Sequence, residues 1–128
     1  MSAVAGAEFS IILTDEGKLY RYTKTLILLI YSWGNGQSGQ LGHGNCEDSL
    51  QPKRIKALQD VYIKRIVVSR CNCYAQSDDQ IYVWGANKNG ELGLGDTVMR
   101  TLPEALKNFD EVLPTVIAGG QRTFILSM

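Results

Sequence analysis

WGNGQSGQLGHGN, at residues 33–45, returns as WGANKNGELGLGD at residues 84–96, an offset of 51 positions. Trp, four Gly and Leu coincide between the two copies. The same offset pairs Pro52 with Pro103, Lys56 with Lys107, Val61 with Val112 and Ile66 with Ile117. Ten identities at one spacing without a gap indicate a tandem repeat.

A shorter motif precedes or follows each copy. AGAEFSIIL at residues 5–13 corresponds to AGGQRTFIL at residues 118–126. The copy at residues 67–75 is degenerate, with Val68 at the position of Gly6 and Gly119. In this alignment Cys73 replaces Ile11 and Phe124, which predicts a core position for it. The repeats divide the chain into half a repeat (1–20), an insertion (21–32), a full repeat (33–83) and most of another (84–128).

Short strands are predicted where β-branched, aromatic and aliphatic residues gather between turn residues. These strands are Phe9–Thr14, Lys64–Ser69, Gln80–Trp84 and Arg122–Ser127. Hairpin turns are expected at Asp15–Gly17 and Asp78–Asp79. Lys53–Leu58 or Glu104–Lys107 could form a helical turn after each proline, but both are too short for an isolated helix. The fold class is therefore all-β.

The repeated residues are predicted to hold the structure together. Each Trp begins a glycine loop and is expected to anchor it through a large buried area. The glycines are expected to permit strained turns and close backbone approach. The predicted structural positions are Gly6, Trp33, Gly34, Gly39, Leu41, Gly42, Gly44, Pro52, Trp84, Gly85, Gly90, Leu92, Gly93, Gly95, Pro103 and Gly119.

The order of these motifs resembles the repeat of the regulator-of-chromosome-condensation family. The resemblance rests on Trp-Gly, Gly-x-Leu-Gly-x-Gly, the proline, and the Leu-Thr-x-x-Gly-x-Leu-Tyr pattern at residues 13–20. It implies a β-propeller of about seven four-stranded blades, each blade drawing strands from two successive repeats. About two and a half repeats are present here, so a partial β-propeller is expected. Phe9 and Arg122 depart from the family, which often has His there.

An insertion separates Tyr20 from Trp33, whereas Tyr82 and Trp84 are separated by one residue. The excess is eleven residues within the segment 21–32. It is interpreted as a strand or β-ribbon built from Leu26–Tyr31, as a projecting element that contacts a partner through Leu26, Leu28 and Ile30, or as a translated intron. The intron hypothesis requires GT and AG at the segment boundaries in the gene.

The composition narrows the classes of function. Lys plus Arg and Asp plus Glu number 13 each, so zero net charge provides no general attraction for nucleic acid or an acidic membrane. The longest apolar run, Leu26–Tyr31, is too short to cross a bilayer as a helix. Three cysteines and no secretory signal favour an intracellular protein, cytoplasmic or nuclear, with reduced thiols.

Two motifs with a chemical interpretation are better explained by the repeat. Gly34–Gly39 matches G-x-G-x-x-G, but Gly42 and Gly44 disfavour the helix that a dinucleotide site needs. A zinc site from His43, Cys46, Cys71 and Cys73 lacks standard ligand spacing. No Ser-His-Asp set can be assembled from one histidine, so no catalytic residue, cofactor or metal is expected.

A protein-interaction module is therefore the leading functional hypothesis, with this chain as a piece of a larger propeller. The alternative is guanine-nucleotide exchange on a Ran-like small GTPase, for which the insertion would be the wedge. The family that the chain resembles also includes chromatin-binding proteins. An open partial propeller would expose strand edges for self-association.

Overall fold

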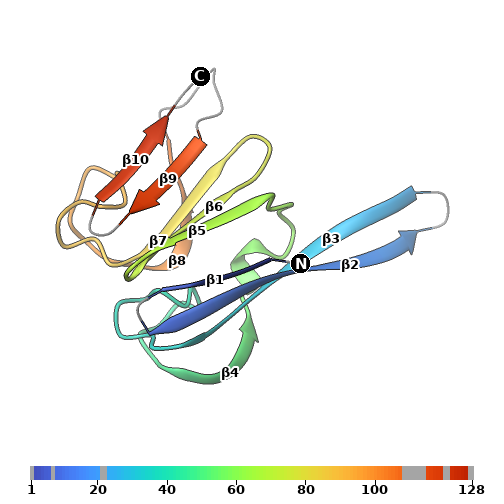
Figure 1. Ribbon diagram of the computed structural model, residues 1–128, viewed down its shortest axis with the longest axis horizontal. Coiled ribbons are helices and arrows are strands. Elements are labelled where there is room, and N and C mark those ends of the chain that lie inside the picture. The colour runs from blue at the N-terminus through green and yellow to red at the C-terminus, as the bar shows by residue number, and fades with distance from the viewer. Residues whose placement is uncertain (1, 7, 21–22, 108–114, 120–121, 127–128) are drawn as a thin grey trace.

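The computed structural model describes residues 2–6, 8–20, 23–107, 115–119 and 122–126 (Figure 1). The elements are β1 (Ser2–Ala5), β2 (Phe9–Tyr20), β3 (Thr23–Gly34), β4 (Ser49–Arg54), the 3-10 turn η1 (Lys56–Leu58), β5 (Arg65–Ser69), β6 (Asn72–Gln76), β7 (Ile81–Gly85), β8 (Arg100–Ala105), β9 (Thr115–Gly119) and β10 (Arg122–Leu126). The four predicted strands are confirmed, and η1 is the one helical element among the described residues.

The strands form two four-stranded antiparallel sheets, ordered β1-β2-β3-β4 and β5-β6-β7-β8, and a β9–β10 pair. Figure 1 shows the two large sheets next to each other, with β9–β10 beside the second. In each sheet the glycine loop separates the third strand from the fourth. Each sheet therefore combines strands from two successive sequence repeats, as the resemblance implied.

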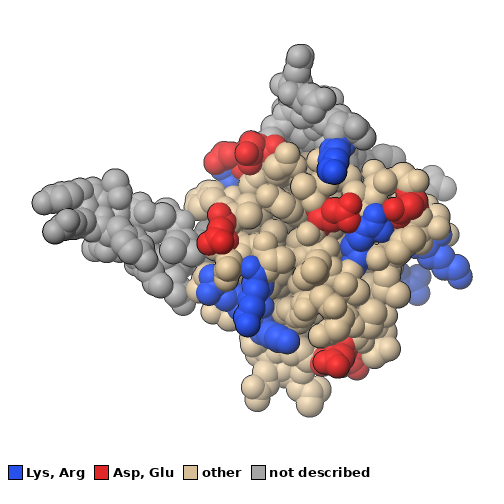
Figure 2. Space-filling model, turned by 180° about the vertical axis from the view of Figure 1, so that it is seen from behind, with Lys and Arg blue, Asp and Glu red and all other residues tan. Residues whose placement is uncertain are grey.

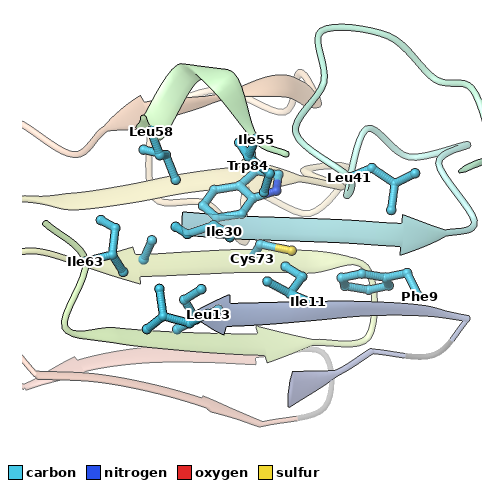
Figure 3. Packing of buried hydrophobic residues seen from close by; sticks show 12 residues of the cluster. Phe9, Ile11, Leu13, Ile30, Leu41, Ile55, Leu58, Ile63, Cys73 and Trp84 are labelled. Atoms are coloured by element: carbon cyan, nitrogen blue, oxygen red, sulfur yellow. The ribbon is translucent and has the colours of Figure 1, made fainter. Parts of the chain in front are cut away.

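The main core lies between the two sheets, and residues from both contribute to it (Figure 3). Strand alternation explains this arrangement, because Phe9, Ile11 and Leu13 are every second residue at the start of β2 and all three belong to the core. The cluster consists of Phe9, Ile11, Leu13, Ile30, Leu41, Ile55, Leu58, Ile63, Ile66, Cys73, Ala75 and Trp84. Cys73 is fully buried, which confirms its predicted core position.

The second sheet also buries its opposite face. Tyr74, Ile81 and Val83 form a further cluster there with Leu92 and Leu106. Both faces of this sheet are thus covered by apolar contacts, as expected for a unit stacked between neighbours.

The first hairpin differs from its expected form, because β2 and β3 pair continuously from Phe9–Gly34 to Tyr20–Thr23. The turn predicted at Asp15–Gly17 is wrong: these residues pair with Leu28, Ile27 and Leu26 inside the ribbon. The insertion gives this segment a partner strand, and cross-strand pairing overrides the local preference of turn residues. The turn predicted at Asp78–Asp79 is confirmed by the Ser77 N–H to Gln80 O bond of 2.9 Å.

Strand pairing matches the degenerate copy at residues 67–75 to the other two copies with a shift of one residue from the sequence alignment. Ser69 pairs with Asn72, Gly119 pairs with Arg122, and the N–H of Gly6 donates to the carbonyl of Phe9. Ser69, not Val68, therefore occupies the position of Gly6 and Gly119. Cys73 accordingly corresponds to Ser10 and Thr123 rather than to Ile11 and Phe124.

Both repeated prolines lie in outer strands of their sheets, Pro52 in β4 and Pro103 in β8. An edge strand tolerates proline because one side of its backbone needs no donor. A helical turn follows Pro52 as η1, but the turn considered at Glu104–Lys107 is wrong, because Glu104 belongs to β8.

Candidate functional site

The glycine loops between the third and fourth strands share one backbone geometry. Gly39 and Gly42 have φ values of 72° and 74°, and their counterparts Gly90 and Gly93 have 73° and 69°. Gly44 and Gly95 follow the same pattern at 88° and 83°. Side chains are strained in this left-handed region, so the predicted reason for these glycines is confirmed. Residues 35–48 form a loop between β3 and β4, and no helix follows Gly34–Gly39 there.

The first loop is packed against the second sheet. A Cβ added at Gly39 would lie 2.8 Å from the carbonyl oxygen of Arg100, and one at Gly42 would lie 3.0 Å from Nε1 of Trp84. The N–H of Gly44 donates to the carbonyl of Thr101 at 2.9 Å. The loop therefore belongs to the junction between sheets.

The second loop has more space around its glycines, as the distances from an added Cβ to the nearest atom show. The nearest atoms to a Cβ at Gly90 and Gly93 lie 3.7 and 3.8 Å away, and none lies within 4 Å at Gly95 among the described residues. The two loops thus have the same fold but different surroundings.

Trp84 joins the sheets through a buried hydrogen bond. Its Nε1 donates to the carbonyl of Gln40 at 2.9 Å, and Sγ of Cys73 lies 3.3 Å from the same oxygen. The expectation that each Trp anchors its own loop is therefore corrected: Trp84 anchors the loop of the preceding repeat. Trp33 occupies the equivalent place on the first sheet and is only half-buried.

Within each glycine loop, a polar side chain that was not predicted from the sequence accepts a hydrogen bond from the loop backbone. The N–H of Ser38 donates to Oε1 of Gln40 at 2.8 Å, and the N–H of Asn89 donates to Oε2 of Glu91 at 2.8 Å. Gln40 and Glu91 lie 51 positions apart, so the recurrence of a long acceptor side chain was the available signal. In the second loop Asn87 adds bonds to the carbonyls of Asp96 and Val98.

An ion-pair cluster extends the second loop to β8. Arg100 contacts Asp96 at 2.7 Å and Glu104 at 2.5 Å. Hydrogen bonds from Arg100 and the Val98 N–H lower the pKa of Asp96. The two carboxylates share one guanidinium, so the cluster keeps a net negative charge while it ties the second loop to the start of β8.

The other repeated residues have structural contacts. Leu41 and Leu92 are both 1% exposed and occupy corresponding places in the two cores. A Cβ at Gly34 would approach the carbonyl oxygen of Glu8 to 2.5 Å, and one at Gly85 that of Cys71 to 2.2 Å. Gly6 lies directly against the ring of Phe9.

The ribbon formed by β2 and β3 is the main projection. Seven residue pairs continue beyond Leu13–Ile30, from Thr14–Leu29 to Tyr20–Thr23. The corresponding hairpin of the second sheet ends its pairing at Gln76–Ile81. Figure 1 shows the ribbon extending away from both sheets. The described part of the insertion, from Thr23 onward, thus forms a strand of a β-ribbon.

Of the three residues proposed as partner contacts, Ile30 is the one whose side chain the structure describes. Ile30 is 2% exposed and packs in the core, so it is wrong as a surface contact. The side chains of Leu26 and Leu28 lie outside the described residues.

Three of the four residues of the zinc interpretation, His43, Cys46 and Cys73, contact residues outside that set. Nε2 of His43 lies 3.0 Å from Oγ of Ser32, which donates to the Leu41 carbonyl at 2.6 Å. Cys46 contacts Met99, and burial raises the pKa of Cys73. No group of three potential metal ligands is found within the described ranges. Nor does any helix there have the length and hydrophobicity to span a membrane.

The sequence pattern of the regulator of chromosome condensation (RCC1) repeat matches residues 29–73 and 78–126. The ultraviolet-B receptor UVR8 of Arabidopsis thaliana is 34% identical over 121 residues, which cover 94% of this chain and 25% of that protein. The human probable E3 ubiquitin-protein ligase HERC6 is 35% identical over 103 residues, or 77% of this chain and 10% of that protein. The chain thus spans a quarter or less of these two relatives.

Two solved structures share the fold over 99% of this chain. Human WBSCR16 has a TM-score of 0.79 at 22% identity, with 30% of its own chain covered. Yeast RCC1 (Prp20), solved with bound Kap60, has a TM-score of 0.75 at 28% identity, with 27% covered. These matches confirm a partial β-propeller, in which the two four-stranded sheets are neighbouring blades. The chain belongs to the regulator of chromosome condensation (RCC1) repeat family.

Proposed function

We propose that this chain is part of a propeller that docks a protein partner, and that the β2–β3 ribbon makes the distinctive contact. The observation that carries the proposal is the seven-pair extension of this hairpin beyond its counterpart in the second blade. The repeated Trp, Leu and Gly residues hold blades and loops together, whereas the ribbon is additional to that framework.

The comparisons support a protein as the partner. Yeast RCC1 was solved in a complex with Kap60. A relative named as a ubiquitin ligase, human HERC2, matches over 2% of its own length, so that name describes a protein of which this chain resembles one small part. We propose binding, without catalysis, as the contribution of the repeats.

Guanine-nucleotide exchange on a Ran-like small GTPase is the second candidate. A projecting ribbon favours it, because exchange can be driven by contact alone and requires no acid–base residue. Exchange would additionally require the ribbon to act on a nucleotide-bound GTPase.

The test replaces residues 14–29 with the four-residue turn Ser77–Gln80 of the second blade. This exchange joins Leu13 to Ile30 as Gln76 is joined to Ile81, so the pairing below the ribbon is retained. The intact protein and the shortened variant are compared for partner capture and for release of labelled GDP from a Ran-like GTPase.

We expect capture of a defined partner to be lost in the shortened variant. Accelerated GDP release that depends on the ribbon would favour exchange instead. Equal capture by both proteins would refute the role of the ribbon. Sequencing the transcript and the gene across codons 21–32 tests the translated-intron hypothesis directly.

A further inference from the structure

A cleft of about 170 Å³ lies where η1, after the first blade, meets β8 of the second. It is lined by Gly42, His43, Lys53, Arg54, Lys56, Ala57 and Leu102. β4 and β8 are the outermost strands of their blades, so the cleft is at the outer rim of the junction between the two blades. None of its lining residues belongs to β2 or β3.

Three cations and no acidic residue line this cleft. Figure 2 shows a group of Lys and Arg side chains close together on one part of the molecular face, with further basic side chains elsewhere on it. The ion pairs found in the described part of the chain use other cations, Lys64 and Arg100. Lys53, Arg54 and Lys56 therefore concentrate positive charge in a chain whose net charge is zero.

Arg54 supplies the more specific observation. Its Nε is buried, yet within the described residues this N–H has no hydrogen-bond partner. A buried donor attached to a charged group is destabilising until an acceptor reaches it. A guanidinium presents Nε and a terminal nitrogen as a planar fork that fits the two oxygens of a carboxylate.

His43 forms a polar wall of the cleft without adding charge near neutral pH. Burial, followed by the nearby charge of Lys53, lowers its pKa. The Ser32 hydroxyl donates its single proton to Leu41, so it accepts a hydrogen bond from Nε2–H of His43. This bond fixes the ring beside the cations.

We propose that this rim cleft binds a glutamate or aspartate side chain from an acidic segment of a protein partner. Arg54 would hold the carboxylate, Lys53 and Lys56 would attract the segment, and Ala57 with Leu102 would contact its methylene carbons. The apolar lining favours a side chain over a free oxyanion. This inference rests on the proposed docking function and names the chemistry of the partner.

The probe is a fluorescein-labelled peptide of eight glutamates, titrated with the intact protein by fluorescence anisotropy at low salt. Arg54→Gln should weaken binding about tenfold or more, because a charge-assisted bond to a desolvated group is lost. Arg54→Lys keeps the charge but loses the fork, so an intermediate affinity is expected. Lys56→Gln, at an exposed position, tests the cleft in a variant whose folding is not at issue.

Lys88→Gln is the matched control, since it removes the same charge from an exposed residue that does not line the cleft. It should change the affinity less than about twofold. Equal weakening by Lys56→Gln and Lys88→Gln would overturn the proposal in favour of diffuse attraction. Displacement of the peptide by submillimolar inorganic phosphate would overturn it in favour of a small-oxyanion site.

The peptide measurements test the cleft independently of the partner-capture measurements, which test the proposed docking function. Unchanged peptide affinity in the Arg54 and Lys56 variants, together with ribbon-dependent partner capture, would reject the cleft and leave docking intact. Loss of peptide binding in those variants without any partner capture would support the cleft and reject the ribbon.

Discussion

Single residues in this fold act mainly at the junction between blades. Gly42 illustrates the point, because its backbone needs a left-handed φ and its missing side chain makes room for Trp84. The spacing of the repeat predicted the first requirement. It could not predict the second, because nothing within one repeat shows that Trp84 lies against the loop of the preceding repeat.

Gly42→Ala should therefore be more destabilising than Gly93→Ala. Both positions have nearly the same φ, 74° and 69°, and share a backbone penalty of about 1–2 kcal/mol. Only Gly42 adds a contact 3.0 Å from Trp84 Nε1, which should cost about 1–3 kcal/mol more through overpacking. Urea unfolding monitored by tryptophan fluorescence measures both, and equal losses would contradict the packing argument.

The cysteines should differ in reactivity. Burial raises the pKa of Cys73 well above its ordinary value, so its thiolate fraction is very small near neutral pH, whereas Cys46 and Cys71 are half-buried. Iodoacetamide should modify Cys46 and Cys71 first and Cys73 only after unfolding. Mass spectrometry of timed samples gives the order, and early modification of Cys73 would contradict its position in the core.

His43 should make stability depend on pH. Its pKa in the folded chain is below the ordinary value of 6.5, so the unfolded chain binds the proton more tightly. The free energy of unfolding should therefore fall as the pH drops below about 6.5 and continue to fall until the folded-state pKa is reached. Urea titrations at pH 5 to 8 measure how the free energy of unfolding depends on pH, and His43→Gln should make this dependence weaker. An unchanged dependence would mean that other titratable groups cause it.

At the level of elements, the strands and their order were predictable because period-two patterns and turn residues mark them. The β2–β3 ribbon was one of three interpretations of the insertion. The hairpin turn was predicted at the wrong residues. Asp15–Gly17 has turn chemistry, but a strand also needs a partner. That partner comes from the aliphatic run in the insertion, so pairing between segments decided the conformation.

The ribbon should be an appendage whose removal leaves the blade folded. Replacing residues 14–29 with the Ser77–Gln80 turn retains the pairs from Phe9–Gly34 to Leu13–Ile30. The loss should be limited to about 1–3 kcal/mol, chiefly from buried Leu29. Circular dichroism and urea unfolding check this, and loss of cooperative unfolding would show that the ribbon is integral to the blade.

At the level of the whole molecule, the two equivalent loops have unequal protection. The Gly44 amide is bonded to Thr101, whereas no atom of the described residues lies within 4 Å of a Cβ added at its counterpart Gly95. The sequence repeat predicted two alike loops and could not show this difference, which arises from what lies beside each blade.

Hydrogen exchange should follow that inequality. In the 128-residue chain, peptides containing residues 39–44 should exchange more slowly than peptides containing residues 90–95. Mass spectrometry after timed exchange measures this, with the β6–β7 hairpin as a protected reference. Equal exchange would mean that the first loop gains no stability from the neighbouring blade.

The bond from Trp84 to the Gln40 carbonyl also gives the assembly a direction. The donor is on one blade and the acceptor on the loop of the blade before it, so the two contacting surfaces are different. Such a contact is heterologous, which means that the two contacting surfaces differ. Each added blade therefore leaves one of these surfaces free to contact a further blade. Successive units end in a ring when their rotations sum to a full circle, and otherwise they continue as a helix. The angle between blades, rather than the strength of their contacts, therefore sets how many units a closed molecule contains.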